Sequence, residues 1–95
     1  MPFQQQNEKP FTRARVGTIT PVEAVGVYGL YRSGRWVYVG RGMIRDRLMA
    51  HLNGDNPCIT REAPTHWVDE ITADHVARER VLIVELTPAC NQQVG

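Results

Sequence analysis

The chain lacks any long apolar run, and this absence excludes whole classes of protein. None of its 95 residues belongs to a stretch approaching the roughly 18 consecutive apolar residues of a transmembrane helix. The first residues, MPFQQQNEKPF, are polar or charged where a signal peptide needs an apolar segment. We therefore expect a soluble, cytoplasmic protein with no membrane partner.

Cysteine and lysine are also scarce. The two cysteines, Cys58 and Cys90, show neither the CxxC spacing of a zinc site nor the density of a disulfide scaffold, so we expect free thiols. Lys9 is the one lysine, and the other ten of the eleven basic residues are arginine. The planar guanidinium of arginine can grip a phosphate through two hydrogen bonds, which favours a phosphate-binding role.

The small net charge of +1 hides an uneven distribution along the chain. Residues 26 to 52 carry five arginines against Asp46, a net +4, whereas residues 53 to 95 carry three arginines against seven acids, a net −4. The basic segment is a reasonable surface for phosphate contacts. A solvated face balanced by the acidic half explains the same charges equally well.

A chain of this length makes one domain with a modest core. Residues 1 to 25 form an N-terminal extension ahead of a domain at 26 to 95, since residues 1 to 19 are polar and show no sustained period. Within the extension, Thr20-Pro21-Val22-Glu23 matches a capping box and predicts a short helical turn.

Two runs typical of β-strands follow, Gly26 to Tyr31 (GVYGLY) and Arg35 to Gly40 (RWVYVG). The turn residues between them predict a hairpin. We expect a three-residue loop at 32 to 34, because Ser-Gly is a poor two-residue turn; this loop would set Tyr28 directly across from Tyr38, with Gly34 at the left-handed position that such loops require. A two-residue loop would instead place the two tyrosines on opposite faces of the sheet.

The remaining elements are two helices and a strand. Met43 to Leu52 repeats apolar residues at helical spacing and ends at Asn53-Gly54, Thr65 to Ile71 alternates as a strand, and Ala73 to Leu86 forms the second helix. The stretch Gly54 to Pro64 reads as an irregular loop. The expected fold is α/β in the order β-β-α-β-α, with a small, mainly antiparallel three-stranded sheet flanked by helices.

Polar side chains occupy apolar faces of both helices. On the second helix Glu79 falls within the arc of Val76, Leu82, Ile83 and Leu86, and a buried carboxylate needs a cation, a metal or donors. On the first helix Arg47 and His51 lie beside the apolar stripe. A structural ion pair between Arg47 and Glu79 explains these positions, and so does a shared polar site, for which we expect Arg47 and Glu79 on the sheet face that carries Tyr28 and Tyr38.

The residues resemble the GIY-YIG nuclease family. The tripeptides Gly26-Val27-Tyr28 and Tyr38-Val39-Gly40 match its signature, with valine in the two isoleucine positions. The resemblance extends over residues 26 to 91. The further matching positions, in the family's order and spacing, are two arginines, a histidine, a glutamate, an apolar pair, a proline and an asparagine: Arg41, Arg47, His51, Glu79, Leu82, Ile83, Pro88 and Asn91.

The resemblance implies a role for each of these side chains. It implies that Glu79 is the single metal-binding carboxylate, which suits Mg²⁺ or Mn²⁺ because these ions keep several waters. Arg47 would neutralise the scissile phosphate, and Tyr28 and Tyr38 would position or deprotonate the water, with either tyrosine as the base. The remaining expected site residues are His51, which would tune a tyrosine, and the substrate-binding Arg41, Arg45 and Asn91.

The implied function is a metal-dependent endonuclease that hydrolyses phosphodiester bonds in DNA. The family uses this domain in DNA repair, recombination, restriction and intron mobility. Specificity would come from the extension, the Gly54 to Pro64 loop, a homodimer or a protein partner. The alternatives are a non-catalytic nucleic-acid-binding module of the same fold and a metal-free interaction module.

Overall fold

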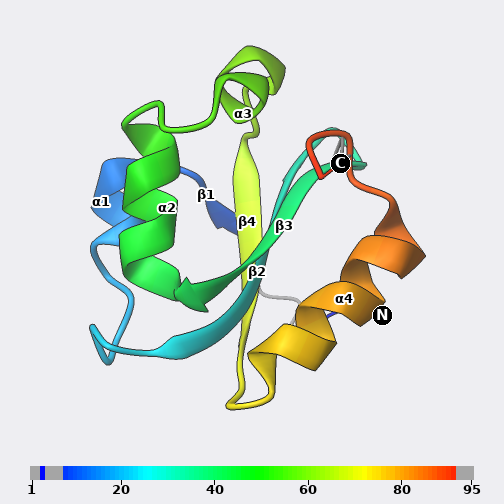
Figure 1. The fold of residues 1–95 in the computed structure, drawn as a ribbon. Helices are drawn as coiled ribbons and strands as arrows, with labels where there is room; N and C mark the ends of the chain where they lie inside the picture. Colours follow the sequence, from blue (N-terminus) through cyan, green and yellow to red (C-terminus); the bar gives the residue numbers. More distant parts are fainter. Residues whose placement is uncertain (1–2, 4–7, 92–95) are drawn as a thin grey trace.

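The computed structural model describes Phe3 and residues 8–91, which form an antiparallel sheet with helices on both faces. The sheet has the strand order β1-β4-β2-β3, and α2 lies on one face of it while α4 lies on the other (Figure 1). In chain order the elements are β1 (Lys9–Pro10), α1 (Arg13–Val16), β2 (Val25–Arg32), β3 (Arg35–Met43), α2 (Ile44–Leu52), α3 (Pro57–Glu62), β4 (His66–Ile71) and α4 (His75–Leu86).

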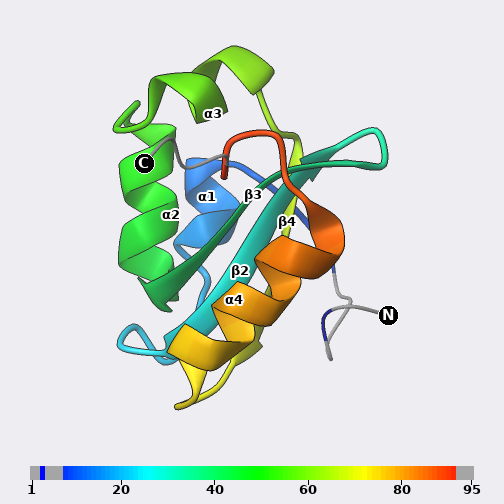
Figure 2. The same ribbon diagram turned by 45° about the vertical axis from the view of Figure 1, so that its right-hand side comes forward.

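Two apolar clusters, one on each face of the sheet, hold these layers together. The cluster under α2 includes Tyr28, Ile44, Leu48 and Trp67, and the cluster under α4 is built on Val27, Val39, Val68, Leu82 and Phe3. Since side chains alternate along a strand, β2 supplies Tyr28 and Leu30 to the first cluster and Val27 to the second. Figure 2 shows the sheet between its two helical layers.

The expected α/β class and order of elements are confirmed, but the expected number of strands is wrong. In the described part of the chain the sheet has four strands, because Lys9 and Pro10 pair with His66 and Trp67 of β4. Residues before position 26 also supply α1, which packs beside α2 and buries Val16 completely. The expected helical turn at residues 20 to 23 is only a turn, in which the backbone N–H of Ala24 donates to the carbonyl of Pro21.

The β2–β3 hairpin has a register that differs from the expected one. Ser33 and Gly34 form a two-residue turn with φ values of 50° and 77°, as a type I′ turn requires. The register then shifts by one residue between Leu30 and Tyr31, so that Leu30 faces Tyr38. The predicted pairing of Tyr28 with Tyr38 is therefore wrong, yet this β-bulge restores both tyrosines to one face.

The segment Gly54 to Pro64 contains a helix where the sequence indicated an irregular loop. The side chain of Asn56 accepts hydrogen bonds from the backbone N–H groups of Cys58 and Ile59, and Pro57 occupies the first turn. An Asn-Pro pair is a recognisable start of a helix, so the signal was present in the sequence. The helix ends at Ala63, which adopts a left-handed conformation.

The two cysteines are not free thiols. Cys58 of α3 and Cys90, which follows α4, form a disulfide between Cα atoms 5.7 Å apart. The expectation failed because their sequence separation of 32 residues says nothing of their separation in space. The bond links the short helix α3 to the segment that runs along β3, where the backbone N–H groups of Ala89 and Cys90 donate to Trp36 and Val37.

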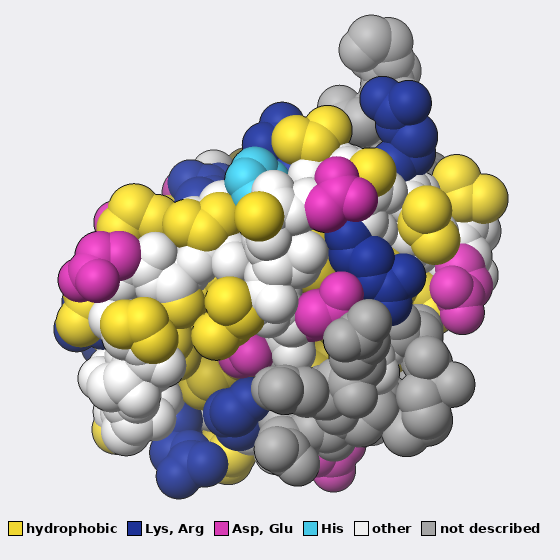
Figure 3. All heavy atoms as spheres, turned by 90° about the horizontal axis from the view of Figure 1, so that it is seen from below, with side chains coloured by type: hydrophobic (Ala, Val, Ile, Leu, Met, Phe, Trp, Pro, Cys, Tyr) yellow, Lys and Arg dark blue, Asp and Glu magenta, His cyan; other side chains and the backbone are white. Residues whose placement is uncertain are grey.

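The surface shows no gathering of one charge on the face drawn in Figure 3, where acidic, basic and apolar side chains are interleaved. Three of the exposed large apolar side chains belong to α4, and the others lie on separate segments: Val76, Val81 and Val84, then Val22, Met43 and Ile71. Some exposure of apolar side chains is ordinary for a globular protein. No helix in the described part of the chain is long and apolar enough to cross a membrane.

The burial of Val16 predicts that the N-terminal segment stabilises the domain. Val16→Ala removes apolar carbons from a site with 0% exposure, so we expect a loss of roughly 1–2 kcal/mol in the free energy of unfolding. Val22→Ala is the matched control, because Val22 lies in the same segment but is 45% exposed and should change little. Urea unfolding of both variants measures the difference, and equal effects would contradict this account of the segment.

Candidate functional site

The two tyrosines of the signature lie side by side on the sheet face covered by α2. Tyr28 of β2 pairs with Gly40 of β3, so it lies diagonally across from Tyr38, which is two residues before Gly40. The ring centroids of the two tyrosines are 6.3 Å apart. Tyr28 is buried and Tyr38 is half-buried. Two phenols therefore share one site, with the hydroxyl of Tyr28 inside the domain.

Steric constraints explain why glycine occupies one position in each of the two tripeptides. A Cβ at Gly40 would lie against the hydroxyl and ring of Tyr28, and a Cβ at Gly26 would collide with the backbone carbonyl of Glu70 on β4. Gly40 thus leaves the space that the Tyr28 side chain occupies, and Gly26 lets β2 and β4 approach.

His51 and Arg47 project from α2 toward these tyrosines, as their i, i+4 spacing allows. The Tyr28 hydroxyl and His51 Nε2 are 2.7 Å apart, and the His51 ring meets the Tyr38 ring edge-on with centroids 5.2 Å apart. The side chain of His51 is almost fully buried, whereas that of Arg47 is 43% exposed. The site therefore has a buried end at His51 and an open end at Arg47.

Asp55 is a site residue that the sequence analysis missed. Its Oδ1 lies 2.7 Å from His51 Nδ1, and its Oδ2 lies 3.4 Å from Nη2 of Arg47. The turn after α2 brings it back, since Gly54 has a φ of 86° and the N–H of Asp55 donates to the carbonyl of Ala50. The sequence signal was the Asn53-Gly54 stop followed at once by an acid.

Burial governs the protonation of this cluster. It raises the pKa of Tyr28 well above the ordinary value, as does the neighbouring Tyr38, while Arg47 partly offsets both effects. Burial also raises the pKa of Tyr38, and the charge of Glu79 adds to that rise. Burial lowers the pKa of His51 despite its contact with Asp55. At neutral pH the cluster thus holds two neutral phenols and a neutral imidazole.

Glu79 approaches the edge strand β3 from the other side of the sheet. It belongs to α4, which covers the face opposite to the tyrosines, and its Oε1 lies 3.2 Å from Nε of Arg41 near the end of the edge strand β3. The expectation that one face of the sheet receives Tyr28, Tyr38, Arg47 and Glu79 together is therefore wrong. Glu79 is 23% exposed at the side chain and pairs with Arg41 rather than Arg47.

The arginines of the basic segment are largely balanced by the acidic half. Ion pairs join three of the five to carboxylates from residues 53 to 95: Arg35 to Glu62, Arg41 to Glu79, and Arg47 to Asp55. The arginine side chains in these pairs are 43–66% exposed, so the pairs are weak enough for a phosphate to compete. Arg45 is half-buried, and its Nε has no hydrogen-bond partner among the described residues.

Asn91 braces the edge strand beneath the site. Its Nδ2 donates to the carbonyl of Val39 at 2.8 Å, and its Oδ1 accepts from the N–H of Val39 at 2.6 Å. Both polar groups of the side chain are thereby engaged with the backbone next to Tyr38. A direct contact between Asn91 and substrate stays a prediction.

The side chains of the described residues limit which metal ion they could hold. Among the described residues there is no group of three or more histidine, cysteine, aspartate or glutamate side chains arranged to hold an ion. A single carboxylate fits Mg²⁺ or Mn²⁺, which retain waters and accept ligands from a phosphate, and does not fit the closed ligand set of a structural zinc site.

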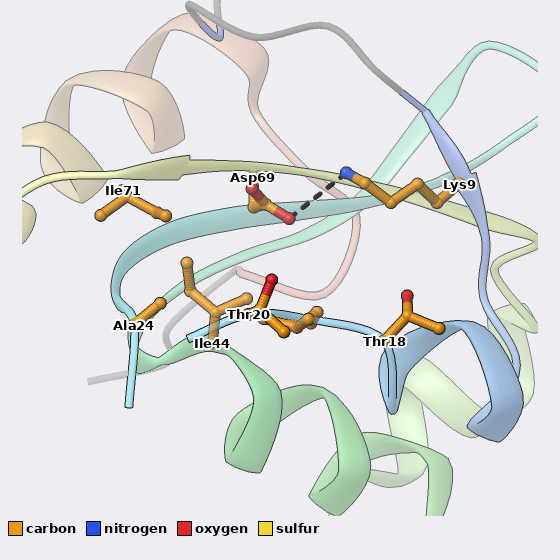
Figure 4. A pocket seen from close by; sticks show the side chains of 8 residues that line it. Lys9, Thr18, Thr20, Ala24, Ile44, Asp69 and Ile71 are labelled. Atoms are coloured by element: carbon orange, nitrogen blue, oxygen red, sulfur yellow. Dashed lines mark hydrogen bonds and ion pairs between the residues drawn. The ribbon is translucent and has the colours of Figure 1, made fainter. Parts of the chain in front are cut away.

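A pocket of about 220 Å³ lies away from this cluster, between β1, β4, the segment before β2 and the start of α2 (Figure 4). Lys9 and Asp69 form an ion pair across 3.4 Å on one wall, with Thr18 and Thr20 on the opposite wall. The pocket shares no residue with the candidate site, and the ion pair balances its charge.

The comparisons with known proteins establish the fold. No protein-family model matches the chain, and no curated protein matches its sequence. The structure is similar to the GIY-YIG N-terminal endonuclease domain of UvrC from Thermotoga maritima, solved as a point mutant bound to the catalytic divalent cation. The TM-score is 0.64 and the identity 18%, and the match covers 85% of this chain and 94% of that domain. The fold is that of a GIY-YIG domain.

The packing of Tyr28 against Gly40 predicts the effect of one added methyl group. Gly40→Ala would push the Tyr28 ring from its place, so we expect a loss of about 1–3 kcal/mol in stability and a larger spacing between Tyr28 and His51. Gly34→Asn is the control, since a side chain there meets no atom and asparagine tolerates a positive φ. Thermal unfolding of both variants checks this, and an unchanged Gly40→Ala protein would refute it.

The lowered pKa of His51 predicts a pH-dependent stability. The folded protein binds the His51 proton less readily than the unfolded chain, in which histidine titrates near 6.5. The contribution of His51 to the free energy of unfolding should therefore be fully present above about pH 6.5. Below that pH the free energy of unfolding should fall by at most about 1.4 kcal/mol per pH unit. Denaturant unfolding between pH 7.5 and 5.5 tests this. His51→Gln should flatten the slope, and an equal slope in parent and variant would assign it to other groups.

Proposed function

We propose that this chain is a divalent-metal-dependent endonuclease that hydrolyses phosphodiester bonds in DNA. The observation that carries the proposal is the meeting of Tyr28, Tyr38, His51 and Arg47, from three different elements, at one partly open site. The likeness to an endonuclease domain in the same fold supports it. The site contains a proton acceptor and a cation beside two phenols, and phosphodiester hydrolysis requires a general base and stabilisation of the charge that builds on the phosphate.

Each side chain has a role suited to its surroundings. Arg47, partly exposed, neutralises the phosphate as charge builds on it, and Arg41 and Arg45 contact the backbone nearby. Tyr28 is the better placed of the two phenols to accept a proton from water, because its own hydroxyl proton has an acceptor in His51. Tyr38 orients the water, and Asn91 holds β3 in place beneath it.

Glu79 is the residue that would hold the divalent ion. Once bound, Mg²⁺ or Mn²⁺ would supply polarisation of the attacking water and of a phosphate oxygen. Only its Oε1 contacts Arg41, and the exposed ion pair that joins them is weak enough to open when the ion binds. Arg41 is then available to the phosphate backbone.

The test is incubation of the full chain with nicked, flapped, branched and linear DNA, with and without Mg²⁺ or Mn²⁺. Cleavage that requires the ion would support the proposal, and the preferred substrate would distinguish a role in repair from one in recombination. Gel filtration in the same buffer shows whether a homodimer is needed. Binding without cleavage of any substrate would favour the non-catalytic module.

The position of Glu79 predicts a separation of cleavage from binding and stability. Glu79→Gln removes the charge that the ion needs, so cleavage should fall below detection while DNA binding persists. Its partner Arg41 is 44% exposed, so the melting temperature should change by only a few degrees. Glu85→Gln, on the exposed side of the same helix, is the matched control.

The two outcomes that count against this role are distinct. A Glu79→Gln protein that cuts at the parent rate would remove Glu79 as the metal ligand. A protein that melts far below the parent would make Glu79 a structural partner of Arg41.

A further inference from the structure

Among the residues that the structure describes, Asp55 is the one acidic side chain that hydrogen-bonds to both Arg47 and His51. Through its two oxygens it contacts His51 Nδ1 at 2.7 Å and Arg47 Nη2 at 3.4 Å. Its side chain is 34% exposed, while that of His51 is 1% exposed, so the carboxylate closes the solvent side of a buried imidazole. It lies in the turn after α2 and belongs to none of the matched signature positions.

The contact with Asp55 determines which nitrogen of His51 carries the proton. A carboxylate oxygen only accepts hydrogen bonds, so Nδ1 of His51 must be the donor. In a neutral imidazole the other nitrogen, Nε2, is then an acceptor. The Tyr28 hydroxyl, 2.7 Å away, donates to it. Asp55, His51 and Tyr28 thus form a directed chain of hydrogen bonds.

We propose that Asp55 is a positioning residue for phosphodiester hydrolysis, which fixes the tautomer and ring orientation of His51 so that His51 can take the proton of Tyr28. This inference rests on the proposed function. Tyr28 is then the base that meets the water, and Tyr38 has no comparable acceptor among its described hydrogen bonds. The arrangement follows the same logic as the buried aspartate that orients a catalytic histidine in hydrolases.

In the proposed step, two proton transfers accompany the attack of water on phosphorus. As the water oxygen bonds to phosphorus, a water proton moves to the Tyr28 oxygen and the Tyr28 proton moves to Nε2 of His51. The bond from phosphorus to the leaving oxygen breaks, that oxygen keeps the electron pair, and it takes a proton from solvent. The imidazolium formed beside Asp55 is stabilised by the carboxylate and later returns its proton to solvent.

A second consequence concerns Arg47. The Asp55 carboxylate also limits the motion of the Arg47 guanidinium that would meet the phosphate. Arg47 and His51 both contact this carboxylate across less than 3.5 Å. One residue therefore orients the base relay and the phosphate-binding cation relative to each other. Gly54 makes this possible, because its φ of 86° turns the chain back over the last turn of α2.

The first test needs no variant. In the metal-free full chain at neutral pH, ¹⁵N NMR of the His51 ring should show a protonated Nδ1 and an unprotonated Nε2. A ring protonated at Nε2 would overturn the proposal, because Tyr28 would then have no acceptor. The measurement does not depend on activity, so it stands even if the chain cuts no DNA.

The second test compares Asp55→Asn with Asp46→Asn, which makes the same charge change on the exposed side of α2. The Asp55 variant should lose kcat by on the order of 100-fold with no rise in KM for DNA. The control should keep the parent kcat.

The pH profile separates positioning from folding. The groups that face His51 are Tyr28 from β2, Tyr38 from β3, Arg47 from its own helix and Asp55, and Asp55 raises the pKa of His51. Removing that charge should move the acid limb of kcat/KM to lower pH, which a smaller folded fraction would not do. An Asp55→Asn protein with the control's kcat and acid limb would overturn the role while leaving the nuclease proposal intact. A parent that never cuts would defeat the nuclease proposal instead.

Discussion

The candidate site depends on the hydrogen bond between the Tyr28 hydroxyl and His51. It joins β2 to α2 through two side chains that are almost completely buried, where an unmade hydrogen bond is costly. The space for it comes from Gly40 on β3, and the hairpin bulge keeps Tyr38 on the same face. Arg47 lies on the same helix as His51, and Asp55 lies in the turn after that helix, where it contacts both side chains.

The sequence predicted the parts that follow from local periodicity. Strands β2, β3 and β4 and helices α2 and α4 were found within a few residues, because alternation and the 3.6-residue repeat are visible without tertiary contacts. The two tripeptides and the Arg47–His51 pair led to the fold, which the structural likeness confirmed. The Asn-Pro start of α3 was visible too, yet the two prolines of that segment obscured it.

What the sequence did not predict is set by contacts between distant residues. The two-residue β1 has too short a pattern to be recognised and exists only through its pairing with β4. The bulge adds one residue to β3 without any signature of its own, and it decided the register. The Cys58–Cys90 bond and the partnership of Glu79 with Arg41 depend on which elements pack together. Asp55 required the three-dimensional path of the turn at Gly54.

The side chain of Asn91 and the backbone of residues 89 and 90 occupy the outer hydrogen-bonding groups of β3 at Val39, Val37 and Trp36. At the other margin of the sheet β1 offers only Lys9 and Pro10, the residue types that discourage strand addition. At these positions the two margins of the sheet resist the addition of a strand from a second molecule, which disfavours aggregation by edge pairing there.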